Sequence, residues 1–301
     1  MKVLITGSSG LIGSELHQHL VKAGCDVITL VRNRKKVSDK AIFWDPENGI
    51  LNPESIRDID AVINFAGEGV AEGRWTERRK KNILDSRVKG TKVLVEAICL
   101  LPQPPKVLIN ASAIGFYGDR GEEVCSEATS GGPGFLAHVC CEWEKAAALA
   151  IDKGIRTVFL RFGVVLSSKG GALRKMLPAF RFGLGGNLGD GQQFVSWVSI
   201  DDVISIIQFA LTKVELKGAV NVVSPNAVSN AVFTKILGEV LHRPTFFSVP
   251  SFVLRLIFGK EMADEVLLAS THVKPKKLEI ADYIFKYPDL KKALQHIIGG
   301  S

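Results

Sequence analysis

The 301-residue sequence lacks the features of several protein classes. No uninterrupted apolar run approaches the roughly 18 residues of a membrane-spanning helix, and the richest stretch, 252–258, is broken by Arg255. Five cysteines form no CxxC pair and six histidines are scattered, so we predict neither a disulfide framework nor a metal site. The odd cysteine count favours a reducing compartment. Because the chain opens on a predicted strand at Val3, we expect no targeting peptide, a cytoplasmic location and no membrane partner.

Basic residues are only modestly in excess over acidic ones. The chain has 38 basic and 31 acidic residues, a net charge of +7, which favours anionic partners without naming one. The densest basic run, 78–81, is typical of a solvated helix face and is not interleaved with aromatic side chains that stack on bases. A phosphorylated small molecule suits this charge as well as nucleic acid does, and we expect no nucleic-acid partner.

Short apolar runs alternate with helical periodicity over the first 160 residues. The apolar runs predict strands at 3–6, 27–31, 61–65, 107–110 and 157–162. The periodic segments predict helices over 11–23, 74–99 and 132–150. Apolar strands separated by helices indicate a parallel sheet covered on both faces, which is the doubly wound α/β class.

The character of the sequence changes after Arg161. Residues 163–191 are rich in glycine and contain one helical piece, at 173–182. A strand at 197–200, a helix from 201 to 211 and a strand at 219–223 predict a return to the sheet, and helical periodicity dominates from 224 onward. We therefore predict two lobes: a sheet lobe of residues 1–165 with 197–223, and a smaller, mostly helical lobe of residues 166–196 with 224–301.

Three glycines follow the first predicted strand and open an amphipathic helix. In this context Gly7 permits a tight turn, Gly10 lets the backbone approach a pyrophosphate, and Gly13 brings the helix against the strand. Dinucleotide phosphates would then lie on unpaired amides at the helix N-terminus. Glycines that serve only a turn are the alternative. We predict cofactor contacts from Gly7, Ser9, Gly10, Leu11, Ile12 and Gly13.

The end of the second strand indicates which dinucleotide is bound. A fold that prefers NAD places an acidic residue there, whereas this chain has no acid from Leu30 until Asp39. A guanidinium can bind a 2′-phosphate bidentately. We therefore predict NADP, held first by Arg32 and second by Arg34; cations that only solvate a loop are the alternative.

Further motifs resemble extended short-chain dehydrogenases/reductases: 64–67 and 112–119 after two strands, and 161–165 after another. More narrowly, 74–76, 141–144, 183–186 and the tail from Val249 resemble the atypical epimerase-family proteins, sometimes labelled cell-division-inhibitor-like, with their C-terminal domain of unknown function. The resemblance covers nearly the whole chain. It implies a Rossmann lobe, a smaller, mostly helical lobe over the nicotinamide end, and cofactor contacts from Asn64, Ala66, Gly67 and Arg161.

The usual catalytic dyad of short-chain reductases is missing. These enzymes use a tyrosine as general acid/base, a lysine four residues later on the same helix, and a serine at the end of the fifth strand. The helix predicted after that strand contains no tyrosine, and the literal YxxxK match starting at Tyr287 is followed by a proline and lies in the tail. Ser112 and Tyr117 remain as the predicted catalytic residues, and a packing role for Tyr117 is an equal alternative.

Two function classes stay open. The first is an NADP(H)-dependent oxidoreductase or epimerase-like enzyme acting on a small carbonyl or alcohol held by Ser112 and Tyr117. The second is a non-catalytic NADP(H)-binding protein, regulatory or redox-sensing, because a fold does not carry function by itself. The sequence identifies neither the substrate nor the oligomeric state.

Overall fold

A computed structural model describes residues 1–299 and has a seven-stranded parallel sheet at its centre. The strands lie in the order β12-β7-β5-β4-β1-β2-β3, which confirms the predicted doubly wound α/β class. Only β3, three residues long, was not predicted, because so short a run has no readable periodicity. In chain order the strands are β1 (Lys2–Thr6), β2 (Asp26–Val31), β3 (Ala41–Phe43), β4 (Ala61–Asn64), β5 (Val107–Ala113), β7 (Arg156–Phe162) and β12 (Gly218–Val222).

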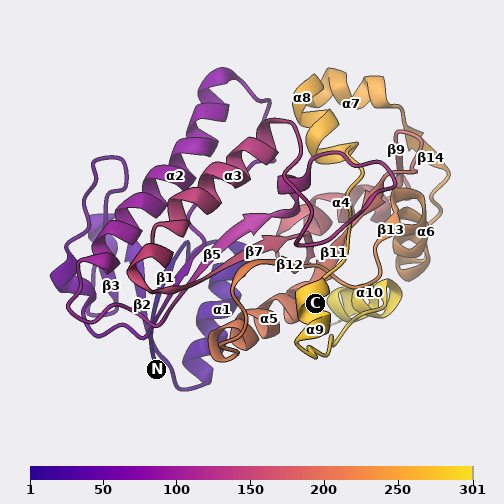
Figure 1. The fold of residues 1–301 in the computed structure, drawn as a ribbon. Helices are drawn as coiled ribbons and strands as arrows, with labels where there is room; N and C mark the ends of the chain where they lie inside the picture. The colour runs from indigo at the N-terminus through magenta and orange to yellow at the C-terminus, as the bar shows by residue number, and fades with distance from the viewer. Residues whose placement is uncertain (300–301) are drawn as a thin grey trace.

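Helices cover both faces of the sheet (Figure 1). On one face lie α2 (Glu77–Cys99) and α3 (Phe135–Ala148), and on the other α1 (Leu11–Lys22) and α5 (Ile200–Thr212). Apolar residues four apart place Leu94 and Ile98 of α2, and Leu16 and Leu20 of α1, in the buried layers on either side of the strands. The result is a three-layer arrangement whose strand carboxyl ends are left for a ligand.

The start of α2 differs from its prediction. The helix begins at Glu77, three residues after the predicted start, because the Thr76 hydroxyl accepts a hydrogen bond from the Arg79 amide at 3.2 Å and caps the helix. Arg74 and Trp75 therefore lie in the loop between β4 and α2.

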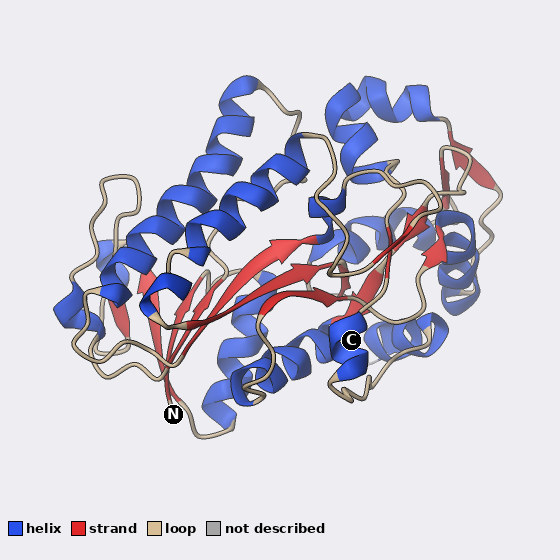
Figure 2. Cartoon of the chain, viewed as in Figure 1, coloured by secondary structure: helices blue, strands red, loops and turns tan. Residues whose placement is uncertain are grey.

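The rest of the chain is mostly helical, with short strand pairs (Figure 2). The helices are α4 (Gly171–Arg181), α6 (Asn230–Leu241), α7 (Ser251–Phe258), α8 (Lys260–Met262), α9 (Lys276–Ile280) and α10 (Leu290–Gly299). The two-stranded pairs are β8 (Val164–Leu166) with β11 (Trp197–Ser199), β9 (Gly186–Leu188) with β14 (Phe247–Val249), β10 (Phe194–Val195) with β13 (Val228–Ser229), and β6 (Val124–Cys125) with β15 (His272–Val273). Within residues 1–299, no helix combines the length and apolar character needed to cross a membrane.

We predicted that residues 197–200 form a strand of the main sheet, and this prediction was wrong. Instead β11 pairs with β8, and Trp197 is fully buried in a separate core with Leu177 of α4 and Phe233 of α6. Conversely, Leu278 of α9 packs into the core of the main sheet. The predicted lobe boundaries stay a prediction.

Candidate cofactor-binding site

A cavity of about 970 Å³ opens at the carboxyl ends of β1, β2 and β4. It lies where the strand order reverses between β1 and β4, which is the place where open parallel sheets bind ligands. Its lining comes from the turn after β1 (7–10), the end of β2 with the residues beyond it (30–33 and 36), the segment after β3 (44 and 46–48), the turn after β4 (65–68), and α2 (82, 85, 86 and 89).

The glycine turn is built for close backbone contact. Gly7 has a φ of +67°, and a Cβ there would lie 2.6 Å from the Phe65 carbonyl oxygen. A Cβ on Gly13 would lie 2.2 Å from the Gly7 carbonyl oxygen, so only glycine lets α1 approach the turn this closely. In the described chain no side chain caps the N-terminus of α1 at Gly10. Its free amides are therefore suited to the pyrophosphate of a dinucleotide.

A buried polar cluster fixes the neighbouring turn. The Thr6 hydroxyl donates to Asn64 Oδ1 at 2.6 Å and accepts from the amides of Phe65 and Ala66 at 3.1 and 3.0 Å. Asn64 is fully buried, and its amide donates to Asn110. Asn64 was predicted to contact the cofactor, but it lies beneath the cavity and positions the backbone that lines it.

Two basic residues from the end of β2 and the segment beyond it line the cavity. They are Arg32 and Lys36. Arg34 instead places its guanidinium over the Phe43 ring, 4.0 Å from the ring centroid. Lys36 was not named from the sequence, although the basic cluster 32–36 contains it. The cavity-lining residues of α2 had no sequence signal, because only the fold brings that helix to the ends of β1 and β2.

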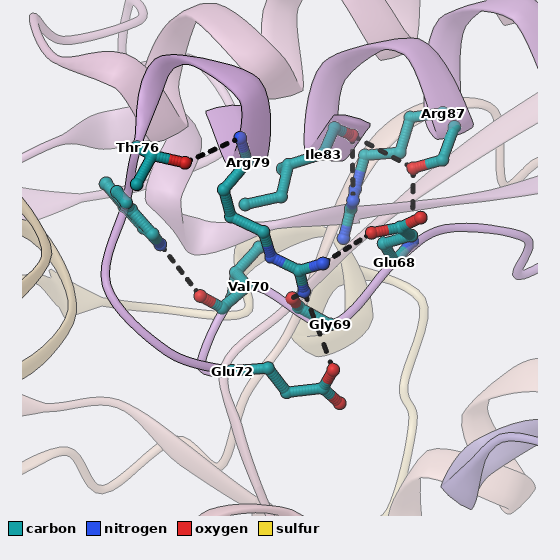
Figure 3. Close-up of polar contacts among 10 residues, drawn as sticks. Glu68, Gly69, Val70, Glu72, Thr76, Arg79, Ile83 and Arg87 are labelled. Atoms are coloured by element: carbon teal, nitrogen blue, oxygen red, sulfur yellow. Dashed lines mark hydrogen bonds and ion pairs between the residues drawn. The ribbon is translucent and has the colours of Figure 1, made fainter. Parts of the chain in front are cut away.

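The loop between β4 and α2 is held against α2 by one arginine (Figure 3). Arg79 donates to Glu68 Oε2 at 2.6 Å and to the Gly69 carbonyl at 2.5 Å, and forms an ion pair with Glu72 at 3.5 Å. The Glu68 amide donates to Ser86 Oγ on the same helix at 3.1 Å. Glu68 lines the cavity and Arg79 does not, so Arg79 positions part of the cavity wall through its contact with Glu68.

The same loop contacts the C-terminal helices. Arg74 donates to the Ile257 carbonyl at 3.0 Å and also to that of Leu256, while Lys80 pairs with Glu261 at 3.0 Å. The run 78–81 was expected to be a solvated helix face. That expectation was wrong for Arg79 and Lys80, because both side chains are largely covered and paired within the molecule.

The predicted catalytic residues belong to a buried polar network. Ser112 donates to Glu144 Oε1 at 2.7 Å, and Arg161 contacts both oxygens of that carboxylate at 2.8 Å. Arg161 also donates to the Tyr117 hydroxyl at 3.1 Å, which in turn donates to Asn221 at 2.7 Å. Burial disfavours the charged guanidinium, but the hydrogen bonds and charge of Glu144 outweigh this effect and raise the pKa of Arg161. For Tyr117, burial disfavours the charged phenolate and so raises the pKa.

This network places several predicted site residues away from the cavity. Ser112 is 3% exposed and Tyr117 is 0% exposed, and Arg161 faces Glu144 instead of the cavity. The lining does contain Gly7, Ser9, Gly10, Arg32, Ala66 and Gly67. Of the other predicted contacts, Leu11 lies against the backbone of Gly170 and Gly171, and Ile12 packs against the sheet core. The catalytic roles of Ser112 and Tyr117 stay predictions.

Comparison with known proteins agrees with this geometry. Residues 3–223 match the NAD dependent epimerase/dehydratase family, and residues 249–297 match a domain of unknown function, DUF1731. An epimerase family protein of Mycobacterium tuberculosis is 42% identical over 292 residues, covering 97% of this chain and 96% of that protein.

Two solved structures are also similar along the full length of this chain. The crystal structure of human epimerase family protein SDR39U1 with NADPH has a TM-score of 0.92 at 34% identity, and each chain is covered completely. A nucleoside-diphosphate sugar epimerase of Corynebacterium glutamicum has a TM-score of 0.81 at 37% identity, with 59% of that longer chain covered. The chain therefore belongs to the NAD dependent epimerase/dehydratase family, and it combines the family's NAD(P)-binding Rossmann fold with a C-terminal DUF1731 domain.

Proposed function

We propose that the chain is an NADP(H)-dependent oxidoreductase or epimerase-like enzyme acting on a small carbonyl or alcohol. The observation that carries this proposal is the cavity at the switch point, where Arg32 and Lys36 supply positive charge beside an acid-free end of β2. The NADPH bound to human SDR39U1 supports the same choice of cofactor.

The residues present fit NADP(H). The amides of the glycine turn would hold the pyrophosphate, and Arg32 with Lys36 would hold the 2′-phosphate. Bound NADP(H) supplies hydride transfer, the chemistry that the side chains lack. The cavity of about 970 Å³ reaches from these cations to the turn at 65–68, which the Thr6–Asn64 cluster holds in place.

In this proposal Ser112 contacts the substrate and Tyr117 is a positioning residue. Because the Ser112 hydroxyl donates a hydrogen bond to Glu144, its oxygen remains an acceptor for the hydroxyl of an alcohol substrate. Arg161 orients Glu144 through hydrogen bonds to both carboxylate oxygens, and Tyr117 orients Arg161.

The second candidate is a non-catalytic NADP(H)-binding protein. It is favoured by one observation: both predicted catalytic hydroxyls are almost completely buried and already hydrogen-bonded within the protein. In an enzyme of this fold, such hydroxyls must be free to meet a substrate.

A carbonyl screen separates the two candidates. NADPH absorbance is followed with a panel of aldehydes and ketones, using the wild type, Ser112→Ala, and Ser205→Ala as a matched serine control on α5. We expect turnover of one carbonyl class, a loss of at least about tenfold in Ser112→Ala, and none in Ser205→Ala. NADPH binding by calorimetry without any turnover would instead establish the non-catalytic candidate, and absence of NADPH binding would refute both.

A further inference from the structure

Six large apolar side chains protrude at the end of the molecule formed by β9, β14 and α7. They are Phe182, Leu184, Phe246, Phe247, Phe252 and Leu256, called here the phenylalanine face. Phe246 is 90% exposed and Phe182 is 83% exposed. Exposed apolar side chains are ordinary when they are scattered, but a group of this size is typical of an interaction site.

The six residues come from segments that are in contact. The parallel pairing of β9 and β14 places Phe247 opposite Gly186, and Arg243 donates to the Arg181 carbonyl at 2.8 Å. These contacts bring Phe182 and Leu184 beside Phe246 and Phe247. The chain then enters α7 two residues after β14, and the three elements lie together at one end of the molecule (Figure 1).

On α7 the apolar side chains are directed outward. Phe252 and Leu256 are four residues apart and so share one helix face, whereas the buried Leu254 lies on the opposite face. The helix has eight residues, far fewer than the roughly 20 needed to span a bilayer. Its exposed face therefore suits a surface contact.

Basic residues predominate in the segments that form the phenylalanine face. The contributing segments 181–184, 243–247 and 251–260 contain Arg181, Arg243, Arg255 and Lys260 and no acidic residue. Arg255 and Lys260 share Asp264 as an ion-pair partner, whereas Arg181 and Arg243 have no ion-pair partner among residues 1–299 and leave an excess of positive charge. An apolar centre bordered by cations complements a surface that is apolar inside and anionic outside.

We propose that the phenylalanine face docks on the surface of an anionic phospholipid bilayer. The phenyl and leucyl groups enter the headgroup boundary, and the four cations lie at the level of the lipid phosphates. A second copy of the chain fits less well, because a two-fold contact through these segments would add the positive charges of Arg181 and Arg243 from both copies, and neither residue has a carboxylate partner. This inference departs from the sequence-based expectation of no membrane partner.

Vesicle sedimentation tests the proposal. The full chain is incubated with phosphatidylcholine vesicles that either contain or lack phosphatidylglycerol. We expect binding at least about tenfold stronger to the anionic vesicles, and a loss of binding as salt is added. The double variant Phe182→Ser/Phe246→Ser should weaken vesicle binding by about tenfold or more.

A matched double variant controls for lost apolar surface. Leu100→Ser/Ile284→Ser removes two other highly exposed side chains and should bind vesicles like the wild type. As a second readout, the fluorescence of Phe246→Trp should be quenched by brominated lipid, whereas that of Leu100→Trp should not. The proposal is overturned if the wild type ignores anionic vesicles, or if both double variants lose binding equally. It is also overturned if sedimentation shows a dimer that only Phe182→Ser/Phe246→Ser dissociates, because a second copy would then cover the face.

Discussion

The Arg79 guanidinium on α2 donates to Glu68 Oε2 at 2.6 Å, and this bond links the helix to the wall of the cofactor cavity beside the bond from the Glu68 amide to Ser86. Arg79→Ala should free the loop 68–76, lower the free energy of unfolding by about 1–2 kcal/mol, and weaken NADP(H) binding several-fold. The neighbouring Arg78 is exposed, so Arg78→Ala is the matched control and should change neither quantity. Calorimetric NADPH titration and urea unfolding measure both effects, and equal losses in the two variants would contradict this role.

Cofactor selectivity should depend on Arg32 and Lys36. Each alanine variant should weaken NADP(H) binding by about ten- to a hundredfold and NAD(H) binding far less, because only NADP carries the 2′-phosphate. Arg34→Ala is the control, since its guanidinium lies over Phe43. If Arg34→Ala discriminates between the two cofactors more strongly than Arg32→Ala, the 2′-phosphate is bound elsewhere.

Alanine substitutions at Gly10 and Gly13, at the start of α1, should have different effects. Gly10 has an ordinary φ of −78°, and a Cβ there would lie 3.3 Å from the Gly7 carbonyl oxygen. Gly10→Ala should therefore fold, with weakened binding of the cofactor. Gly13→Ala brings a methyl group against the Gly7 backbone and should lower the free energy of unfolding by at least about 2 kcal/mol. Thermal unfolding with and without NADPH separates the two outcomes.

The buried ion pair should be far more important for stability than an exposed one. Glu144→Ala leaves the Arg161 guanidinium buried without its counter-charge and should destabilise the fold by about 3–5 kcal/mol. Glu142→Ala removes the exposed pair with Lys145 on the same helix and should cost under about 1 kcal/mol. Similar urea midpoints for the two variants would refute the importance of the buried pair.

Stability should fall on the alkaline side partly because of Cys140. Burial raises the pKa of this thiol from 9.0 to about 11, so the folded state keeps the proton at a pH where the unfolded chain has lost it. The contribution of the neutral thiol is complete below about pH 9 and is lost progressively as the pH rises to about 11. Cys140→Ala should reduce the fall in the free energy of unfolding between about pH 9 and pH 11 by about 2 kcal/mol or less, as measured by urea unfolding at a series of pH values.

Much of the fold followed from local patterns. Apolar runs separated by periodic segments predicted the parallel sheet, and the glycine spacing identified the turn after β1 that lines the cavity. Both signals are local, because a buried strand requires a run of apolar residues and a tight turn requires glycine at closely spaced positions.

Features that depend on distant partners could not be predicted in this way. Tyr117 is buried because its hydroxyl meets Asn221, 104 residues away, and Lys80 is covered because Glu261 lies 181 residues later. Arg34 and Lys36 belong to the same basic cluster, and only the position of Phe43 decides which of them turns away from the cavity. No spacing within the sequence encodes such choices.

The small strand pairs have a consequence for biosynthesis. β6 pairs with a strand 148 residues later, since Val124 pairs with His272 and Cys125 with Val273, and β9 likewise pairs only with the later strand β14. Until β14 and β15 have been synthesised, these edges remain open to foreign strands. A chain truncated after residue 223, where the match to the epimerase family ends, should consequently aggregate or bind chaperones. The C-terminal segment supplies strands that pair with β6 and β9 and is therefore an integral part of the fold.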